Sequence, residues 1–182
     1  MRALVHPAPP LADDVVRLRP WQEADVPAVV EAFADPLNHR FSWPFTSRYG
    51  EADARRALAA QEQARTHGAE LASALVEPRT ELPVLGSVSL YDVERDRGRA
   101  AIGYWLAPAA RGRGVASHAV ELLAGWAFAE LGLERLQITC DPDNRGSRAV
   151  AERCGFAFER VLPAHFPYKG ALRDTALFTR SR

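Results

Sequence analysis

The run Arg111–Ala116 (RGRGVA) constrains this chain most, because it joins a strand-like stretch, residues 101–106, to a long apolar helical pattern at about 115–131. The first N–H groups of a helix have no acceptor inside the helix, and the helix dipole adds partial positive charge at the same end. Gly112 and Gly114 lack Cβ atoms, so an anion can approach the main chain closely. The run is therefore predicted to bind a phosphate or pyrophosphate, with a merely solvated loop as the plain alternative.

Two arginines, Arg111 and Arg113, add permanent positive charge at the rim of this turn. The Gly-x-Gly-x-x-Ser spacing that begins at Gly112 also comes near the dinucleotide-binding fingerprint. That motif usually belongs to an early strand–helix–strand unit, with an acidic residue about 20 positions later. Here the turn lies past mid-chain, and the next acidic cluster, at Asp141 and Asp143, comes later. Dinucleotide binding is therefore the weaker phosphate interpretation.

The 182 residues suit one domain with a proper core and are too few for two. The 23 basic and 23 acidic residues cancel, so no global field attracts nucleic acid or an anionic membrane. Cys140 and Cys154 form neither a disulfide framework nor a metal-binding spacing, which is typical of a reduced, cytoplasmic protein without a metal. No signal core or apolar run of membrane-spanning length is present. The proline-rich residues 1–13 are expected to form a mobile arm ahead of a single domain at 14–182.

Hydrophobic periodicity predicts an α+β fold. Strands are expected at 15–19, 70–76, 84–91, 99–106, 133–140, 156–162 and 172–180, and helices at 26–34, 51–68, 115–131 and 145–153. Short consecutive strands favour antiparallel pairing, whereas the strand–helix–strand unit around the glycine turn should pair in parallel by a right-handed crossover. The predicted sheet is thus mixed, mostly antiparallel and flanked by helices. The aromatic segment 35–49 has no clean period and is read as a loop, and 163–170 as a linker.

Three motifs follow one another in order along the second half of the chain. They are Ile102-Gly-Tyr-Trp-Leu106, then Arg111-x-x-Gly114-x-Ala116, and then Asn144-x-x-Ser147 continuing to Glu152-x-x-Gly155-Phe156. With these motifs the sequence resembles the GNAT acetyltransferases, and within them the type that acts on ribosomal-protein N-termini (RimJ/RimL type). The resemblance covers nearly the whole chain, from Arg17 through Asp174.

The resemblance implies an acetyl-CoA site between two neighbouring strands that splay apart. The main chain at Trp105 and Leu106 would hydrogen-bond the pantetheine arm. The pyrophosphate-binding residues that the resemblance implies are Arg111, Gly112, Arg113, Gly114, Val115 and Ala116. A residue at the Asn144 position would also bind the cofactor, although Asn144 could equally cap the short helix that follows.

The same resemblance places Ser147 near the thioester sulfur, where its hydroxyl can donate a proton to the leaving CoA thiolate. A strand N–H near Leu106 would polarise the thioester carbonyl. The plain alternative for Ser147 is an ordinary position in the first turn of a helix.

Many relatives carry a glutamate just before the Ile-Gly-Tyr-Trp run, and this chain has Ala101 at that position. The obvious carboxylate base is therefore missing. Substitutes are Asp92, Glu94, His165 and Asp174, each of which is more typical of a solvated surface group. The loss is less serious for an α-amine, whose pKa is about 8, than for a lysine-like amine with a pKa of about 10.

The aromatic side chains Phe41, Trp43 and Tyr49 are predicted to line the substrate pocket, with a satellite core as the alternative. The leading hypothesis is an acetyl-CoA-dependent N-acetyltransferase that acts on the α-amine of a protein or peptide N-terminus, by direct attack on the thioester. The alternatives are acetylation of a small amine, such as an antibiotic or metabolite, and a module that binds acetyl-CoA without turnover. The sequence leaves the assembly state open, with a homodimer as one option.

Overall fold

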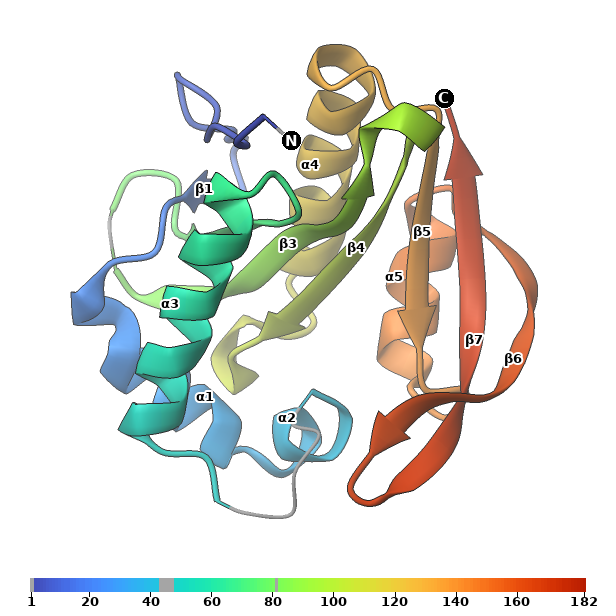
Figure 1. Ribbon diagram of the computed structural model, residues 1–182. Coiled ribbons are helices and arrows are strands. Elements are labelled where there is room, and N and C mark those ends of the chain that lie inside the picture. Colours follow the sequence, from blue (N-terminus) through green and yellow to red (C-terminus); the bar gives the residue numbers. More distant parts are fainter. Residues whose placement is uncertain (1, 43–47, 81) are drawn as a thin grey trace.

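A seven-stranded sheet with the order β1-β2-β3-β4-β5-β7-β6 forms the centre of the computed structural model, which describes residues 2–42, 48–80 and 82–182 (Figure 1). The strands are β1 (Arg17–Arg19), β2 (Leu71–Val76), β3 (Val84–Glu94), β4 (Arg99–Leu106), β5 (Arg135–Cys140), β6 (Ala157–Tyr168) and β7 (Ala171–Ser181). All neighbouring strands pair antiparallel except β4 and β5, which are parallel. The predicted α+β class and the mixed, mostly antiparallel sheet are confirmed.

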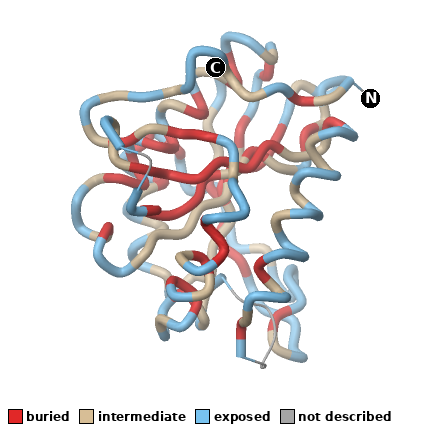
Figure 2. The backbone as a smooth tube through the Cα atoms, turned by 90° about the vertical axis from the view of Figure 1, so that its left-hand side faces the viewer, coloured by how far each residue is buried: buried red, intermediate tan, exposed pale blue. Residues whose placement is uncertain are grey.

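Helices cover both faces of the sheet (Figure 1). They are α1 (Val26–Ala34), α2 (Pro36–Phe41), α3 (Glu51–Thr66), α4 (Val115–Glu130) and α5 (Arg145–Arg153), with short 3-10 turns η1 (Glu23–Asp25), η2 (Arg95–Arg97) and η3 (Pro108–Ala110). The main core lies between the sheet and α4, with α5 beside α4 on the same face. A smaller core under α1 and α3 covers the opposite face. Figure 2 shows the buried residues gathered along the strands in the middle of the molecule. No helix among the described residues is both long and apolar enough to cross a membrane.

The crossover from β4 through α4 to β5 positions the site. Helix α4 buries an apolar face that recurs at helical spacing, including Ala119, Val120 and Leu123, against β3 and β4. Strands β4 and β5, which α4 connects, pair at only three positions, from Arg99↔Arg135 to Ala101↔Gln137. Beyond them the strands continue unpaired with each other and move apart, as Figure 1 shows. The expected splayed strand pair is therefore present.

Two segments form more regular structure than expected. Residues 36–41, read as part of a loop, form α2, because the Asp35 carboxylate accepts hydrogen bonds from the N–H groups of Leu37 and Asn38 at 3.1 Å and Pro36 occupies the first turn. Strand β6 continues through most of the expected 163–170 linker. Its prolines are tolerated because β6 is an edge strand, whose outward N–H groups have no partner strand within the sheet.

The N-terminal segment packs onto the domain in place of the expected mobile arm. Leu4 is fully buried in the main core. The Leu4 N–H donates to the Arg65 carbonyl at 3.0 Å, and the Arg65 guanidinium donates to the Leu4 carbonyl at 2.7 Å. The Asp13 carboxylate accepts from the N–H of Val15 at 2.8 Å and lies 2.7 Å from His118 Nδ1 on α4. A single buried leucine among prolines gives no periodicity, so sequence patterning could not reveal this attachment.

We expect Leu4→Ala to lower the free energy of unfolding by about 2–5 kcal/mol, because it leaves a cavity in the main core. The neighbouring Val5 is 69% exposed, and Val5→Ala should change stability by no more than about 0.5 kcal/mol. Urea denaturation of both variants measures the difference. Equal, near-zero effects would show that the segment is not held to the core.

Candidate functional site

A cleft of about 590 Å³ opens where β4 and β5 move apart. Its walls come from α2, the end of β4, the glycine turn with the start of α4, and α5. Among the residues that line it are Trp105, Leu106, Arg111, Gly112, Gly114, Val115, Ala116, Asn144 and Ser147. The structure thus brings together all the sequence-predicted cofactor-binding residues except Arg113, and Ser147 with them. The Arg113 guanidinium instead pairs with Glu77 at 2.8 Å.

The glycine turn presents main-chain N–H groups to this cleft. Gly112 and Gly114 have φ angles of 73° and 80°, a left-handed conformation that glycine adopts at little cost. No side chain caps the start of α4, and its first turn contains no acidic residue. Its N-terminal N–H groups therefore have no side-chain acceptor, and together with the helix dipole they favour an anion at this end of the cleft.

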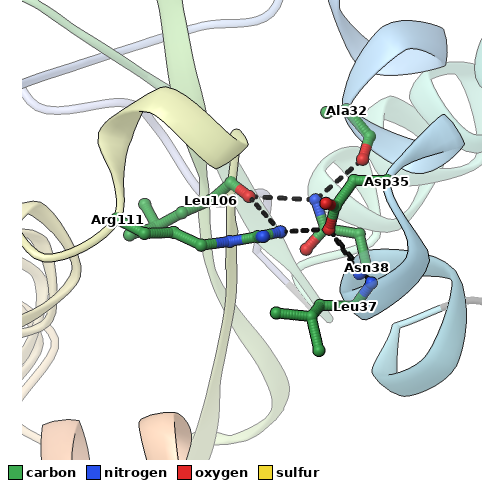
Figure 3. A network of polar contacts seen from close by, with 6 residues as sticks. All are labelled: Ala32, Asp35, Leu37, Asn38, Leu106 and Arg111. Carbon is green, nitrogen blue, oxygen red and sulfur yellow. Dashed lines mark hydrogen bonds and ion pairs between the residues drawn. The ribbon is translucent and has the colours of Figure 1, made fainter.

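Arg111 lines the cleft and connects its walls (Figure 3). Its guanidinium donates to the Asp35 carboxylate, and more weakly to the Leu106 carbonyl at 3.4 Å. The buried Asn38 amide donates to the carbonyls of Ala32 and Leu106, both at 2.9 Å. Helix α2 is thereby fixed to the end of β4 and to the turn. We interpret Arg111 as a residue that positions the cleft wall, a role that sequence reasoning did not foresee.

The main chain at the end of β4 faces the cleft. The Ala107 N–H donates to the Leu85 carbonyl of β3 at 2.9 Å. Because hydrogen-bond direction alternates along an antiparallel strand, the N–H and carbonyl of Leu106 point away from β3. The two side-chain donors on the Leu106 carbonyl agree with this direction. The Leu106 N–H lies on the same edge of β4, on the cleft side.

Two hydroxyl groups meet on the cleft wall between β4 and α5. Tyr104 Oη lies 2.8 Å from Ser147 Oγ and donates to the Ser147 carbonyl at 3.0 Å. Burial raises the pKa of Tyr104 well above its usual value, so the phenol remains protonated at neutral pH. The Asn144 side chain caps α5 by accepting from the Ser147 N–H at 3.1 Å. Sequence reasoning missed Tyr104, because its partner lies 43 positions away in the chain.

The two cysteines differ in their surroundings. Cys154 is a core group, and burial raises its pKa to about 11. Cys140 is only partly buried at the end of β5, where burial raises its pKa and a hydrogen bond with Ser147 acts in the opposite direction. Cys140 therefore lies at the edge of the site. Within residues 2–42, 48–80 and 82–182, no cluster of three or more His, Cys, Asp or Glu side chains is suited to hold a metal ion.

The predicted substrate-pocket residues do not share one cavity. Phe41 lines the main cleft and a neighbouring cleft of about 190 Å³, which continues along β5 and the β6–β7 hairpin. Tyr49 stacks on Phe33 at 4.5 Å between ring centroids and lines a separate cavity of about 290 Å³ under α1 and α3. Burial raises the pKa of Tyr49 to about 12. Trp43 lies outside the described residues.

The candidate bases have other partners or other locations. Glu94 pairs with Arg97 and Arg99 at the hairpin between β3 and β4, far along the strands from the cleft end. The Asp174 carboxylate accepts from the Ala164 N–H at 2.8 Å and lines the cleft of about 190 Å³, and His165 Nδ1 lies 2.8 Å from Thr175 Oγ1. Asp92 is exposed and lines a different pocket, next to Glu94. Ala101 is buried between β3 and β5.

Comparisons with known proteins agree with this geometry. Residues 16–157 match the family model described as an acetyltransferase (GNAT) domain. The ribosomal-protein-serine acetyltransferase of Escherichia coli (strain K12) is 35% identical over 98 residues, which are 53% of this chain and 54% of that protein. The chain spans about half the length of the curated relatives it matches.

Solved structures share the fold. Mycobacterium smegmatis RimJ in complex with CoA-disulfide has a TM-score of 0.80 at 25% identity, over 91% of this chain and 81% of that chain. The microcin C7 self-immunity acetyltransferase MccE in complex with acetyl-CoA and AMP has a TM-score of 0.81 at 22% identity, over 93% of this chain and 94% of that chain. The arrangement of sheet and helices is therefore one that this chain shares with acetyltransferases.

Asp35 provides a test of the network in Figure 3. Its hydrogen bond with Arg111 is the main cause that holds the pKa of Asp35 below its usual value. A carboxyl group with a lowered folded-state pKa stabilises the fold above its unfolded pKa, and this stability is lost as the pH falls through the folded pKa. Asp35→Asn keeps the helix cap without the charge, whereas Asp35→Ala removes both.

At pH 7 we expect the free energy of unfolding to fall from wild type to Asp35→Asn to Asp35→Ala, the lost cap alone costing about 0.5–2 kcal/mol. The advantage of wild type over Asp35→Asn should shrink as the pH falls below the ordinary carboxyl pKa of about 4 and through the lower folded-state pKa, where the wild-type carboxylate is protonated. Urea denaturation across this range measures both. A gap that does not change with pH would show that the charge on Asp35 contributes nothing.

Proposed function

We propose that this chain, which belongs to the GNAT family of acetyltransferases, transfers an acetyl group from acetyl-CoA to an amine, and that its acceptor is the α-amine of a protein or peptide N-terminus. The observation that carries the proposal is the cleft at the strand divergence. It joins an uncapped helix N-terminus at one end to the Tyr104–Ser147 hydroxyl pair on its wall.

The cleft fits acetyl-CoA in shape and in chemistry. Its volume of about 590 Å³ is within the range of small-molecule sites. The N–H groups at the start of α4 would hold the pyrophosphate, since a Cβ at Gly112 would meet no atom within 4 Å and the turn is open toward a ligand. The free main-chain edge of β4 at Leu106 would hydrogen-bond the pantetheine arm. When bound, acetyl-CoA supplies an activated acetyl group as a thioester.

The residues around the cleft would do three things for the reaction. The Leu106 N–H, which lies on the cleft side of β4, would polarise the thioester carbonyl. The Ser147 hydroxyl, held by Tyr104 at 2.8 Å, would donate a proton to the departing thiolate. The rigid walls would hold the acceptor nitrogen close to the thioester carbon, which is the main requirement for direct attack.

An α-amine is the favoured acceptor for a chemical reason. A base is needed mainly when the amine is protonated, and an α-amine with a pKa of about 8 is neutral in a useful fraction at pH 7. The buried Ala101 provides no carboxylate at the position where many relatives have one. The matching Escherichia coli protein is named for a ribosomal-protein serine, which also favours a protein acceptor. A small amine remains the second candidate, because the same cleft for acetyl-CoA would serve it.

A thiol-release assay with acetyl-CoA tests the proposal. The panel would contain peptides with a free N-terminal serine or alanine, the same peptides with a blocked N-terminus, polyamines and aminoglycosides. Turnover with free but not blocked peptides would support the proposed acceptor. Turnover with small amines alone would reject a peptide acceptor. Binding of acetyl-CoA without turnover of any amine would show that the protein is a binding module and not an enzyme for these acceptors.

Gly114→Asp should abolish the stabilisation by acetyl-CoA, because it adds a negative charge to the proposed pyrophosphate site. Wild type at saturating acetyl-CoA should melt at a higher temperature than without it, through mass action. Gly132→Asp is the matched control, since Gly132 has a φ of 65° at the opposite end of α4 and open space around its Cβ position. It should lose intrinsic stability but keep the ligand-induced shift. A normal shift in the Gly114 variant would place the pyrophosphate elsewhere.

Ser147→Ala should lower kcat by a factor within or below about 10²–10⁴, the range typical of one general acid. The dissociation constant of acetyl-CoA should not change, and the melting temperature should stay within about two degrees, since a single hydrogen bond contributes little. Tyr104→Phe should give a smaller loss if it acts by holding Ser147. Wild-type turnover by Ser147→Ala, under conditions where chemistry limits the rate, would assign the proton to another donor.

A further inference from the structure

Tyr91 occupies a position on the sheet that the proposed mechanism does not use. It lies on β3 directly opposite Ala101 of β4, which in turn is opposite Gln137 of β5. Residues directly opposite one another in neighbouring strands share a face, and so do residues two apart in one strand. Tyr91, Ala101 and Thr139 therefore lie on one face of the sheet, in the region where β4 and β5 begin to separate.

The Tyr91 ring lies across β4. A Cβ built on Gly103 would be 3.1 Å from Tyr91 Cε1, closer than nearly all real contacts. Gly103 and the small Ala101 thus leave the space that the ring fills. Tyr91 and Thr139 of β5 line the same cleft, and an interaction with the Thr139 side chain lowers the Tyr91 pKa that burial raises. The tyrosine therefore extends from β3 over β4 to β5, across the divergence of the two strands.

This Tyr91–Thr139 pair is the counterpart of the Tyr104–Ser147 pair on the other face. Tyr104 is adjacent to Gly103, so its side chain points to the opposite face of β4. Tyr91 and Thr139 line the cleft of about 190 Å³, together with Cys140 and Thr175. The two clefts have Arg40 and Phe41 in common. A group that enters the second cleft thus approaches the strand gap from the face opposite the Tyr104–Ser147 pair.

We propose that the Tyr91–Thr139 pair is the contact for the acceptor's amino group, with Tyr91 Oη accepting a hydrogen bond from the nitrogen. The proposal rests on the proposed function, because it takes the acceptor to be an amine. In the reaction the nitrogen–carbon bond forms and the carbon–sulfur bond breaks. The nitrogen then loses its extra proton to water, the thiolate receives one from the Tyr104–Ser147 pair, and the pair regains a proton from water. Tyr91 therefore binds and orients the amine without acting as a base.

The surroundings of Tyr91 suit this role. Burial raises the pKa of the phenol, so it remains protonated, and its oxygen has a lone pair that can accept from the amine. The carboxylates of Asp92 and Glu70 act on the phenol and favour a partner that gains positive charge, as the attacking nitrogen does. The cleft that Tyr91 lines is also lined by two more carboxylates, Asp141 and Asp174, and by the guanidinium groups of Arg40 and Arg173. A hydrogen bond to a group that carries charge is stronger than one between neutral groups. The hydrogen bond from the nitrogen to Tyr91 should therefore strengthen in the transition state, where the nitrogen becomes positive.

Tyr91→Phe tests the proposal, because it keeps the ring over Gly103 and removes only the hydroxyl. With an N-terminal serine peptide as the probe, we expect kcat/KM for the peptide to fall about 10- to 100-fold, as for a hydrogen bond to a charged group. The KM for acetyl-CoA and the acetyl-CoA-induced shift in melting temperature should not change. Thr139→Val should also lower kcat/KM, whereas Thr139→Ser, which keeps a hydroxyl, should retain most of the activity. The double variant should lose less than the product of the two single losses.

Thr179→Val is the matched control. Thr179 lies on β7 opposite Gln137 of β5, and the substitution removes a hydroxyl group that lines neither cleft. It should leave kcat/KM unchanged. Wild-type kcat/KM in Tyr91→Phe would overturn the inference, as would an equal loss of acetyl-CoA binding, which would make Tyr91 a structural residue. Failure of the proposed function is distinguishable, because wild type itself would then acetylate no peptide. If wild type acetylates only a small amine, the same variants apply to that amine, since the proposed contact is with the amino group.

Discussion

The short parallel pairing of β4 with β5 is the constraint on which the site depends. Only three residue pairs join the strands, and beyond Ala101 the main-chain groups on this edge of β4 have no partner strand. Polar backbone groups inside a protein need other partners. The Leu106 carbonyl finds them in Asn38 and Arg111, which draws α2 against the end of the strand. The cleft therefore forms because the pairing of β4 with β5 ends at Ala101 and Gln137.

The separation of β4 from β5 also opens the gap between these strands to both faces of the sheet. On the face covered by α4 and α5, the uncapped helix start and Ser147 border the main cleft. On the other face, Tyr91 and Thr139 border a second one. A donor held in one cleft and an acceptor held in the other would meet without either passing the other. Such an arrangement favours direct transfer, because it needs no covalent enzyme intermediate to carry the acetyl group between sites.

Local signals made the glycine turn, α4 and the parallel crossover predictable, because each depends on neighbouring residues. Helix α2 was missed although Asp35-Pro36 is a helix-start signal, since crowded aromatic residues drew the interpretation toward a loop. The partnership of Tyr104 with Ser147 and that of Arg111 with Asp35 join residues 43 and 76 positions apart, and no periodicity records such contacts. Sequence also gave Phe41 and Tyr49 a shared pocket, whereas the fold places them in separate cavities. The motifs thus predicted which residues meet in the main cleft, whereas the crowded aromatic residues did not predict a common cavity.

The two outermost strands affect how the protein behaves at high concentration. An exposed sheet edge offers unpaired N–H and carbonyl groups on which a strand of another molecule can add. At one edge, β1 is only three residues long, and at the other, β6 contains Pro163 and Pro167, which lack N–H groups. Neither edge therefore gives a continuous template, although Phe158 and Val161 of β6 are 51% and 43% exposed. The prolines that interrupt the periodicity of β6 thus also protect the chain against aggregation by strand addition.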